Sequence, residues 1–246
     1  MNGLGIVAAL IAESRPLGSA GRRGAEPATL ADGTQLIVTG VGPAAAAAGA
    51  RRLLASGARA LLSWGLAGAL DPALEAGTVV LPHEVISPEG RVLLTTADWR
   101  ERVSGEIAAS HVVCCGRLLT CREPLGSTAA KALAFRETGA VAADMESSAI
   151  AEVASAGRVP FLVVRAIVDT AQDAVPEVAL SAAGVGQDRL RLGRLLATLA
   201  RTPGELPALI RLARRYRSAS RALSAVAGSG VLTREIRRNL PGSALP

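Results

Sequence analysis

The sequence has few aromatic residues, few cysteines and histidines, and no long uninterrupted apolar run. Phe, Trp and Tyr make up 2% of the 246 residues, although half of all residues are apolar. The core must therefore be built from layers of Ala, Leu and Val, which favours close contact between helices and a sheet. A chain of this length can bury one large α/β core or two small ones, and one domain is the simpler prediction.

The scarce cysteines and histidines disfavour a metal site. Cys114, Cys115 and Cys121 are an odd number and lack the spacing of metal ligands, and His83 and His111 do not complete a set. We therefore expect reduced thiols in a cytoplasmic protein with no metal and no organic cofactor.

No apolar run is long enough to span a membrane, because Arg51, Arg52 and Arg59 interrupt the most alanine-rich region. The opening MNGLGIVAALIAE has no basic segment and reaches Glu13 without a secretory pattern, so it predicts a first buried strand. We expect a soluble protein, or at most a peripheral one at the inner face of the membrane.

The positive charge is concentrated near the C-terminal end. Residues 187–246 hold 12 arginines and three acids, a local balance of +9, whereas the net charge of the whole chain is +6. Tyr216 is the one aromatic residue in this region, so platforms for base stacking are absent. The pattern therefore disfavours a nucleic-acid partner, which would give a DNA affinity with a steep salt dependence.

Residues 206–226 predict a basic amphipathic helix, introduced by the segment TPGELP. Its apolar face holds Leu209, Leu212, Ala213, Tyr216 and Leu223, and its basic face holds Arg211, Arg214, Arg215 and Arg221. One interpretation is a terminal helix docked on the protein with its arginines in solvent. The other is attachment to an anionic lipid surface. We divide the chain into a main domain, residues 1–200, and a helical extension, residues 201–246.

Short aliphatic runs alternate with alanine-rich segments along the main domain. The expected strands are residues 4–11, 35–39, 60–64, 78–81, 112–115 and 161–167, and two of the expected helices are residues 43–56 and 144–156. This alternation predicts a parallel or mixed sheet covered by helices on both faces. Ligands of such sheets bind at the carboxyl ends of the strands.

The turn TGVGPAAAAAG follows a strand and opens a helix, as a dinucleotide fingerprint does, and Ala45 can serve as its third small residue. However, no acid ends a following strand about twenty residues later to hold a ribose. A Rossmann oxidoreductase is therefore poorly supported, and a tight turn for helix packing explains the glycines equally well.

Three acids fall at strand ends. Glu146 is expected near the start of a helix, where the helix dipole keeps it ionised as an acceptor for a sugar diol, and Asp144 is expected to cap the same helix. Asp169 ends an apolar strand, so burial should raise its pKa and let it donate a proton. Glu13 follows the first strand, where it could orient or deprotonate a water. Each acid taken singly is explained equally well as a cap or loop residue.

Five motifs occur in an order that resembles the nucleoside phosphorylase and nucleosidase superfamily, from about Gly5 to Leu199. They are GIVAALIAE, VTGVGPAAAAAGA, SWGLAGAL with GTVVLP, ADMESSAIAEVA, and VPFLVVRAIVDTA. The resemblance implies a three-layer α/β/α sandwich whose central mixed sheet is partly barrel-like. It also implies that residues 1–200 form a catalytic domain for a small nucleoside, and that the protein is a homo-oligomer.

The resemblance also assigns roles to single residues. Glu146 corresponds to the acid that binds the ribose hydroxyls, and Met145 to the side chain that packs on the sugar. Asp169 corresponds to the acid that protonates or polarises N7 of the purine. Glu13 corresponds to the carboxylate that activates water in the hydrolytic branch.

Further substrate contacts are expected at Gly42 and Gly65, in the two glycine turns, and at Leu66 beside the sugar. The segment Cys121–Pro124, which includes Glu123, falls where the family contacts the base.

Two positions depart from the phosphorolytic members of the family. These members hold phosphate with a serine and, in some branches, an arginine three residues before it, but this chain has Leu66 and Ser63 there. A phosphate site would have to recruit Arg15, Arg51 or another arginine. With Glu13 retained, the pattern favours water over phosphate as the nucleophile; phosphate would be a co-substrate only in a phosphorolytic reaction.

The basic tail, together with ADMES and SWGLAGAL, resembles the hopanoid-associated branch of the superfamily, whose expected substrate is adenosylhopane. The resemblance thus implies an N-ribosyl hydrolase that releases adenine from a 5′-modified adenosine in hopanoid biosynthesis. A phosphate-dependent purine nucleoside phosphorylase and a non-catalytic nucleoside- or lipid-binding module are the alternatives.

Overall fold

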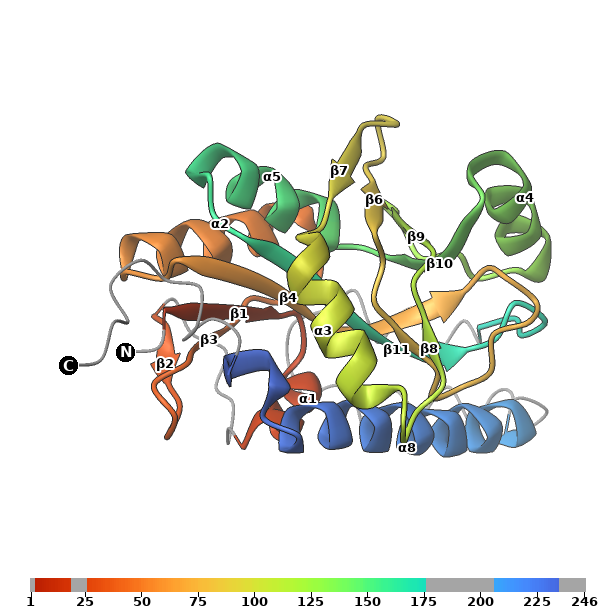
Figure 1. Cartoon of the computed structure of the whole chain (residues 1–246). Helices are drawn as coiled ribbons and strands as arrows, with labels where there is room; N and C mark the ends of the chain where they lie inside the picture. The colour runs from red at the N-terminus through yellow and green to blue at the C-terminus, as the bar shows by residue number, and fades with distance from the viewer. Residues whose placement is uncertain (1–2, 19–25, 176–205, 235–246) are drawn as a thin grey trace.

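The computed structural model describes residues 3–18, 26–175 and 206–234. Its centre is a mixed sheet of eleven strands flanked by helices (Figure 1). The strands are β1 (Leu4–Ala8), β2 (Ala28–Thr29), β3 (Gln35–Val38), β4 (Ala60–Ala69), β5 (Val79–Val80), β6 (Glu84–Ile86), β7 (Val92–Leu94), β8 (Val113–Cys114), β9 (Arg117–Thr120), β10 (Ala140–Asp144) and β11 (Phe161–Asp169).

The helices cover both faces of the sheet. They are α1 (Ile11–Ser14), the 3-10 turn η1 (Arg15–Leu17), α2 (Pro43–Ala55), α3 (Ala97–Ile107), α4 (Thr128–Thr138), α5 (Ser147–Gly157) and α8 (Leu206–Gly228). Helices α2 and α5 pack together on one face, whereas α3 and α8 lie on the other (Figure 1). The α/β class and the layered, mixed sheet predicted from the sequence are confirmed. The predicted boundary after residue 200 falls outside the described residues.

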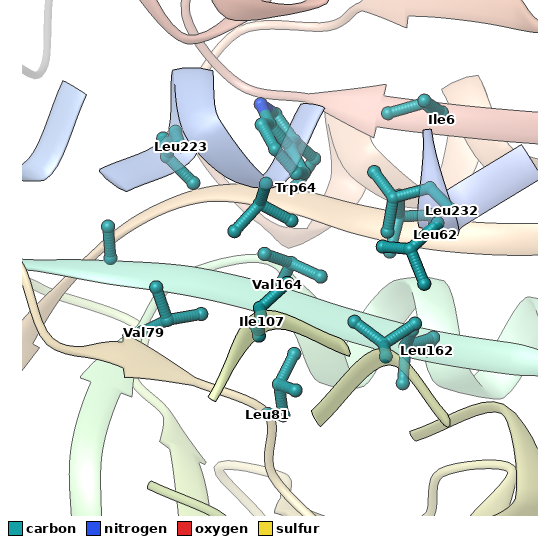
Figure 2. Close-up of a cluster of buried hydrophobic side chains, with 14 of the residues drawn as sticks. Ile6, Leu62, Trp64, Val79, Leu81, Ile107, Leu162, Val164, Leu223 and Leu232 are labelled. Carbon is teal, nitrogen blue, oxygen red and sulfur yellow. The ribbon is translucent and has the colours of Figure 1, made fainter. Parts of the chain in front are cut away.

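Alternate residues of the central strands supply two cores, as the two-residue period of a strand requires. In β4, Leu61 packs under α2 and α5, whereas Leu62 joins the cluster under α3 and α8. Val163 and Val164 of β11 divide in the same way. Figure 2 shows the second cluster, where Trp64 and Leu223 lie close to the aliphatic side chains of the sheet. Aliphatic layers on both faces thus fix the strands whose ends carry the acids.

Strand β4 places those ends around one point. Its first half lies parallel to β1 and β11, and its second half is antiparallel to β10 at Gly68 and Ala69. The chain leaving β1 therefore passes beside the middle of β4, while β10 and β11 end beside its second half. Three acids, Glu13, Asp144 and Asp169, are gathered in this way.

All six apolar runs predicted as strands contain strands, although the bounds differ. The run at residues 60–64 extends to Ala69, and the run at 4–11 stops at Ala8 because Ile11 begins α1. The expected helix at 43–56 is α2. The prediction that a helix begins at Asp144 is wrong, since Asp144 ends β10 and α5 begins at Ser147.

Helix α8 is docked on the sheet through Ala219, Ala222, Leu223 and Val226, which are buried in the cluster that contains Trp64. Arginines 211, 214, 217 and 221 are exposed on its outer side. The docked interpretation of the tail therefore agrees with the structure. Of the predicted apolar face, Leu223 is buried, Leu212 and Tyr216 are half-buried, and Ala213 is exposed. Within the described residues, none of the helices combines the length and the apolar character that a membrane span requires.

Candidate active site

A cavity of about 260 Å³ lies where the ends of β1, β10 and β11 meet the second half of β4. Four buried acids line it, namely Glu13, Asp144, Glu146 and Asp169, together with the exposed acid Glu123. Most of the other lining is apolar and includes Leu10, Val41, Leu66, Leu70, Leu125, Val168 and Val175. Buried acids in an apolar cavity are candidates for proton transfer, because burial shifts their pKa values towards neutrality.

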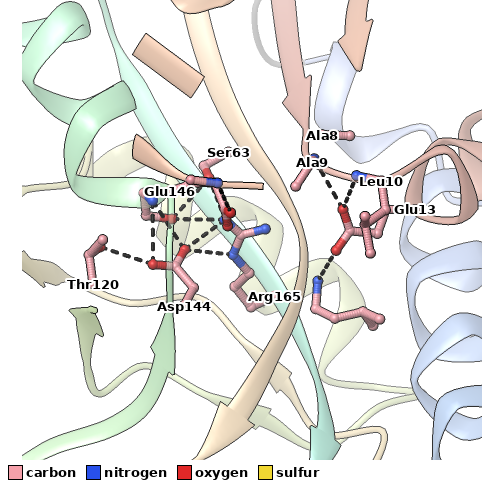
Figure 3. Close-up of polar contacts among 12 residues, drawn as sticks. Ala8, Ala9, Leu10, Glu13, Ser63, Thr120, Asp144, Glu146 and Arg165 are labelled. Atoms are coloured by element: carbon pink, nitrogen blue, oxygen red, sulfur yellow. Dashed lines mark hydrogen bonds and ion pairs between the residues drawn. The ribbon is translucent and has the colours of Figure 1, made fainter. Parts of the chain in front are cut away.

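Glu13 is fixed at both carboxylate oxygens. Its Oε2 accepts hydrogen bonds from the amides of Ala9 (3.1 Å) and Leu10 (2.8 Å), and its Oε1 accepts from the amide of Leu66 (3.0 Å) (Figure 3). The indole nitrogen of Trp64 donates to the carbonyl of Glu13. Burial raises the pKa of Glu13, against the opposing effects of Arg165 and the three amides. The short helix α1 thus presents a rigid carboxyl group whose basicity is increased.

Arg165 is the buried cation at the centre of the site (Figure 3). Its Nε and Nη2 donate to Asp144 Oδ2 at 2.9 and 2.7 Å, and Nη2 also donates to Ser63 and Ser147. The same Nη2 lies 3.9 Å from Glu146 Oε2. The guanidinium therefore holds the end of β10 and the start of α5 against β11 and β4.

Glu146 is the residue that precedes helix α5, and its Oε1 accepts a hydrogen bond of 2.9 Å from the amide of Gly42. Burial, and then the neighbouring Asp144, raise the pKa of Glu146 to about 7, although Arg165 and Gly42 act in the opposite direction. The prediction that Glu146 lies in the first turn of the helix and remains ionised is therefore wrong. Desolvation and a like charge outweigh the helix dipole here.

Asp169 ends β11 and forms a buried ion pair with Lys131 of α4. Burial raises the pKa of Asp169, and the positive charge of Lys131 offsets part of this rise. The predicted direction of the pKa shift is thus confirmed. The carboxyl group of Asp169 packs over Gly68 of β4, two residues beyond the Leu66 amide that binds Glu13. Glu13 of α1 and Asp169 of β11 therefore both lie beside β4, two residues apart along that strand, and both line the cavity.

Six of the eight predicted site residues line the cavity, namely Glu13, Leu66, Glu123, Met145, Glu146 and Asp169. The other two support it from behind. Gly42 binds Glu146 through its amide, and a side chain at Gly65 would meet Arg165 and Glu13. The structure thus brings the predicted residues together, while their roles toward a substrate stay predictions.

Sequence reasoning missed several members of the site. Arg165 was overlooked, although a charge within the apolar run FLVVRAIVD requires a buried partner. Asp144 was interpreted as a cap; it does accept a hydrogen bond from the amide of Ser147, but its main partner is Arg165. Lys131 was also missed, although it is the single lysine of the sequence.

A substitution at Gly65 tests how tightly Arg165 and Glu13 are held. A Cβ at Gly65 would lie 2.4 Å from Arg165 Nη1 and 2.6 Å from Glu13 Oε1, so Gly65→Ala must displace both. We expect a loss of roughly 1 to 3 kcal/mol in the free energy of unfolding. The control Gly105→Ala, at an exposed site of α3 with free space around it, should instead gain roughly 0.5 to 1 kcal/mol. Equal unfolding energies in urea titrations would contradict this account.

The raised pKa of Glu146 predicts a dependence of stability on pH. The folded protein holds this proton up to about pH 7, whereas the unfolded chain releases it near the ordinary value of 4.5. The wild type should therefore lose stability as pH rises between these values, by up to about 1.4 kcal/mol per pH unit from this group. Glu146→Gln should lack this part of the slope, and Glu137→Gln, at an exposed site of α4, should retain it. Parallel stability curves for the wild type and Glu146→Gln would overturn the assignment.

Comparisons with known proteins agree with the fold. The family model described as the phosphorylase superfamily matches residues 28–201. The nucleosidase of Neisseria meningitidis for 5′-methylthioadenosine and S-adenosylhomocysteine, solved with methylthio-immucillin-A, is 17% identical with a TM-score of 0.67, covering 94% of this chain and 98% of its own. The corresponding nucleosidase of Campylobacter jejuni is 17% identical, with a TM-score of 0.66, and the match covers 94% of this chain and 98% of the nucleosidase.

A third similar structure is the futalosine hydrolase of Helicobacter pylori strain 26695. It is 17% identical, with a TM-score of 0.63, and the match covers 92% of this chain and 97% of the hydrolase. At these identities the solved structures support the fold, whereas the family model matches well over half of the sequence. The chain therefore belongs to the phosphorylase superfamily.

Proposed function

We propose that this protein is an N-ribosyl hydrolase that cleaves the N-glycosidic bond of a 5′-modified adenosine and releases adenine. The observation that carries the proposal is the convergence of three buried carboxyl groups, Glu13, Glu146 and Asp169, on one cavity. The similar solved structures are named as nucleosidases and a hydrolase, which supports a nucleoside as the substrate.

Asp169 and Glu146 would act on the two halves of the nucleoside. Asp169, whose pKa is raised by burial, would give its proton to N7 of the purine while the bond between C1′ and N9 breaks and its electron pair moves into the base. Glu146 would accept hydrogen bonds from the ribose hydroxyls, with Met145 packed against the sugar. Negative charge near the ribose stabilises the oxocarbenium-like sugar that forms at C1′.

Glu13 would activate the water that acts as the nucleophile. Its raised pKa favours acceptance of a proton, so that a water beside it loses one proton to the carboxylate while the water oxygen bonds to C1′. Three backbone amides hold the carboxylate in one orientation during this step. The products are the free base and a sugar with a hydroxyl at C1′.

The basic residues around the cavity support water rather than phosphate as the nucleophile. Among the described residues that line the cavity, Lys131 is the one basic residue, and its ammonium group already donates hydrogen bonds to three oxygen atoms. Arg165 is committed to Asp144 and two serines. Arg15 and Arg51, the candidates named from the sequence, are exposed and do not line the cavity.

The apolar lining supports an apolar 5′ substituent on the substrate. Leu10, Val41 and Leu66 lie in the same wall region as Glu13 and Glu146 and give a hydrocarbon group a favourable environment. We propose a lipid-linked adenosine, with adenosylhopane of hopanoid biosynthesis as the specific candidate. The resemblance of the basic tail, ADMES and SWGLAGAL to the hopanoid-associated branch supports this candidate.

The exposed arginines of α8 support delivery of such a substrate from a membrane surface. Four of them, at positions 211, 214, 217 and 221, follow helical spacing on the side away from the core, and Ile210 is 46% exposed beside them.

The protein should therefore bind vesicles that contain phosphatidylglycerol, and raising the salt should weaken this binding. Changing all four arginines to glutamine should abolish it, whereas changing Arg91, Arg122 and Arg136 should not. Equal sedimentation of all three proteins with the vesicles would refute the membrane surface.

The activity itself is tested by adenine release from a 5′-alkyl-5′-deoxyadenosine in phosphate-free buffer. The wild type should release adenine and free sugar, and Asp169→Asn should lose roughly 10²- to 10⁴-fold in kcat while it still binds the nucleoside. Asp98→Asn, at an exposed site of α3, is the matched control and should keep full activity.

Three outcomes would contradict the proposal. Full activity of Asp169→Asn would show that Asp169 is not the proton donor. A strict requirement for phosphate, with a sugar 1-phosphate as product, would instead support the phosphorylase. Tight nucleoside binding without release of adenine would support a binding module.

A further inference from the structure

Helix α4 contains one buried residue, and that residue is a lysine. Lys131 is 1% exposed, whereas the other side chains of α4 are half-buried or exposed. Lysine is among the residues least often buried, because its charge loses hydration unless oxygen atoms replace the water. Lys131 is also the only lysine among the 246 residues, while arginine supplies the remaining basic side chains. Its position therefore calls for a specific explanation.

The ammonium group of Lys131 is enclosed by three oxygen atoms. Nζ donates to Asp169 Oδ2, to the carbonyl of Thr170 at 2.9 Å and to the carbonyl of Asp173 at 3.0 Å. An ammonium group has three N–H donors, so all of them are used. Lys131 therefore has no N–H left for a base or a phosphate, and it must act on the substrate through Asp169.

The contact also decides which oxygen of Asp169 is available. Lys131 occupies Oδ2, whereas Oδ1 has no hydrogen-bond partner among the described residues, and Asp169 lines the cavity. The turn behind the carboxyl group is closed by Asp173, whose Oδ2 accepts from the amide and the hydroxyl of Thr170. Arg215 of α8 pairs with the same Asp173. The carboxyl group of Asp169 is thus held from α4 and from its own turn, with one oxygen left for a ligand.

Resting on the proposed function, we propose that Lys131 is the positioning residue of the proton donor. It fixes Oδ2 of Asp169 so that Oδ1 meets N7 of the purine, and its positive charge makes Asp169 a stronger acid.

The charges around Asp169 make Lys131 its main electrostatic partner. Arg215 acts on Asp169 more weakly, and Asp173 directs its carboxylate to Thr170 and Arg215. The strand beside Asp169, β4, contributes Gly68, which has no side chain. Removing the charge of Lys131 should therefore raise the pKa of Asp169 and keep its proton on it to higher pH.

The test compares kcat for adenine release as a function of pH in Lys131→Met, Lys131→Arg and Arg136→Met. In Lys131→Met the alkaline limb should move up by roughly 1 to 3 pH units. Its maximal kcat should fall roughly 100-fold, because the carboxyl group is no longer oriented. Lys131→Arg keeps the charge and should restore the position of the limb. Arg136→Met removes an exposed charge from the same helix and should match the wild type.

A second measurement does not depend on activity or on a folded variant. Because the wild type has one lysine, protein labelled with ¹⁵N at lysine Nζ should give a single ammonium signal at neutral pH. The three oxygen atoms should protect that signal from exchange with water, and adenine should shift it by contacting Asp169.

Several outcomes would overturn the assignment. If the alkaline limb of the kcat–pH profile stays in place in Lys131→Met while kcat falls, the role of Lys131 is purely structural. Loss of the ammonium signal to water exchange would show that the enclosure does not form. If the wild type itself releases no adenine, the proposed function fails and the proton-transfer role fails with it, even where the ammonium signal is protected.

Discussion

The site depends on one buried guanidinium. Arg165 lies within β11 between the buried apolar residues Val164 and Ala166. Its positive charge offsets the negative charges of Asp144, Glu146 and Glu13. Removing one member of such a buried cluster leaves an uncompensated charge and is therefore strongly destabilising. Since Asp144 ends β10 and Glu146 precedes α5, the same contact also fixes the strand and the helix that form one wall of the cavity.

The balance of buried charge determines the chemistry of the cavity. Four buried acids face it, whereas Arg165 and Lys131 are the buried cations among the described residues that contact them. Burial raises the pKa values of Glu13, Glu146 and Asp169, and the two cations offset only part of this rise. A site of this kind can hold protons near neutral pH and still present negative charge to a cationic sugar. That combination is what cleavage of a glycosidic bond requires.

Much of this arrangement could be predicted from the sequence, because aliphatic runs mark the buried strands and acids at strand ends mark the site. Glu13, Glu146 and Asp169 were placed correctly at one edge of the sheet. The protonation of Glu146 was not, since it depends on the distance to Asp144, and no spacing in the sequence gives that distance. Lys131 lies on a helix with a weak apolar pattern, so its burial follows only from how α4 packs. The strands β2, β6, β7, β9 and β10 were missed because each has five residues or fewer and includes at least one residue that is not buried. The homo-oligomer implied by the family resemblance stays a prediction.

In the proposed reaction the buried carboxyl groups direct water, and not phosphate, to C1′. The most direct measurement is ³¹P NMR of the wild type turning over a 5′-alkyl-5′-deoxyadenosine in phosphate buffer. Adenine should accumulate while the inorganic phosphate signal stays constant and no other phosphorus signal appears. A growing sugar 1-phosphate signal, matched in amount to the adenine released, would contradict it.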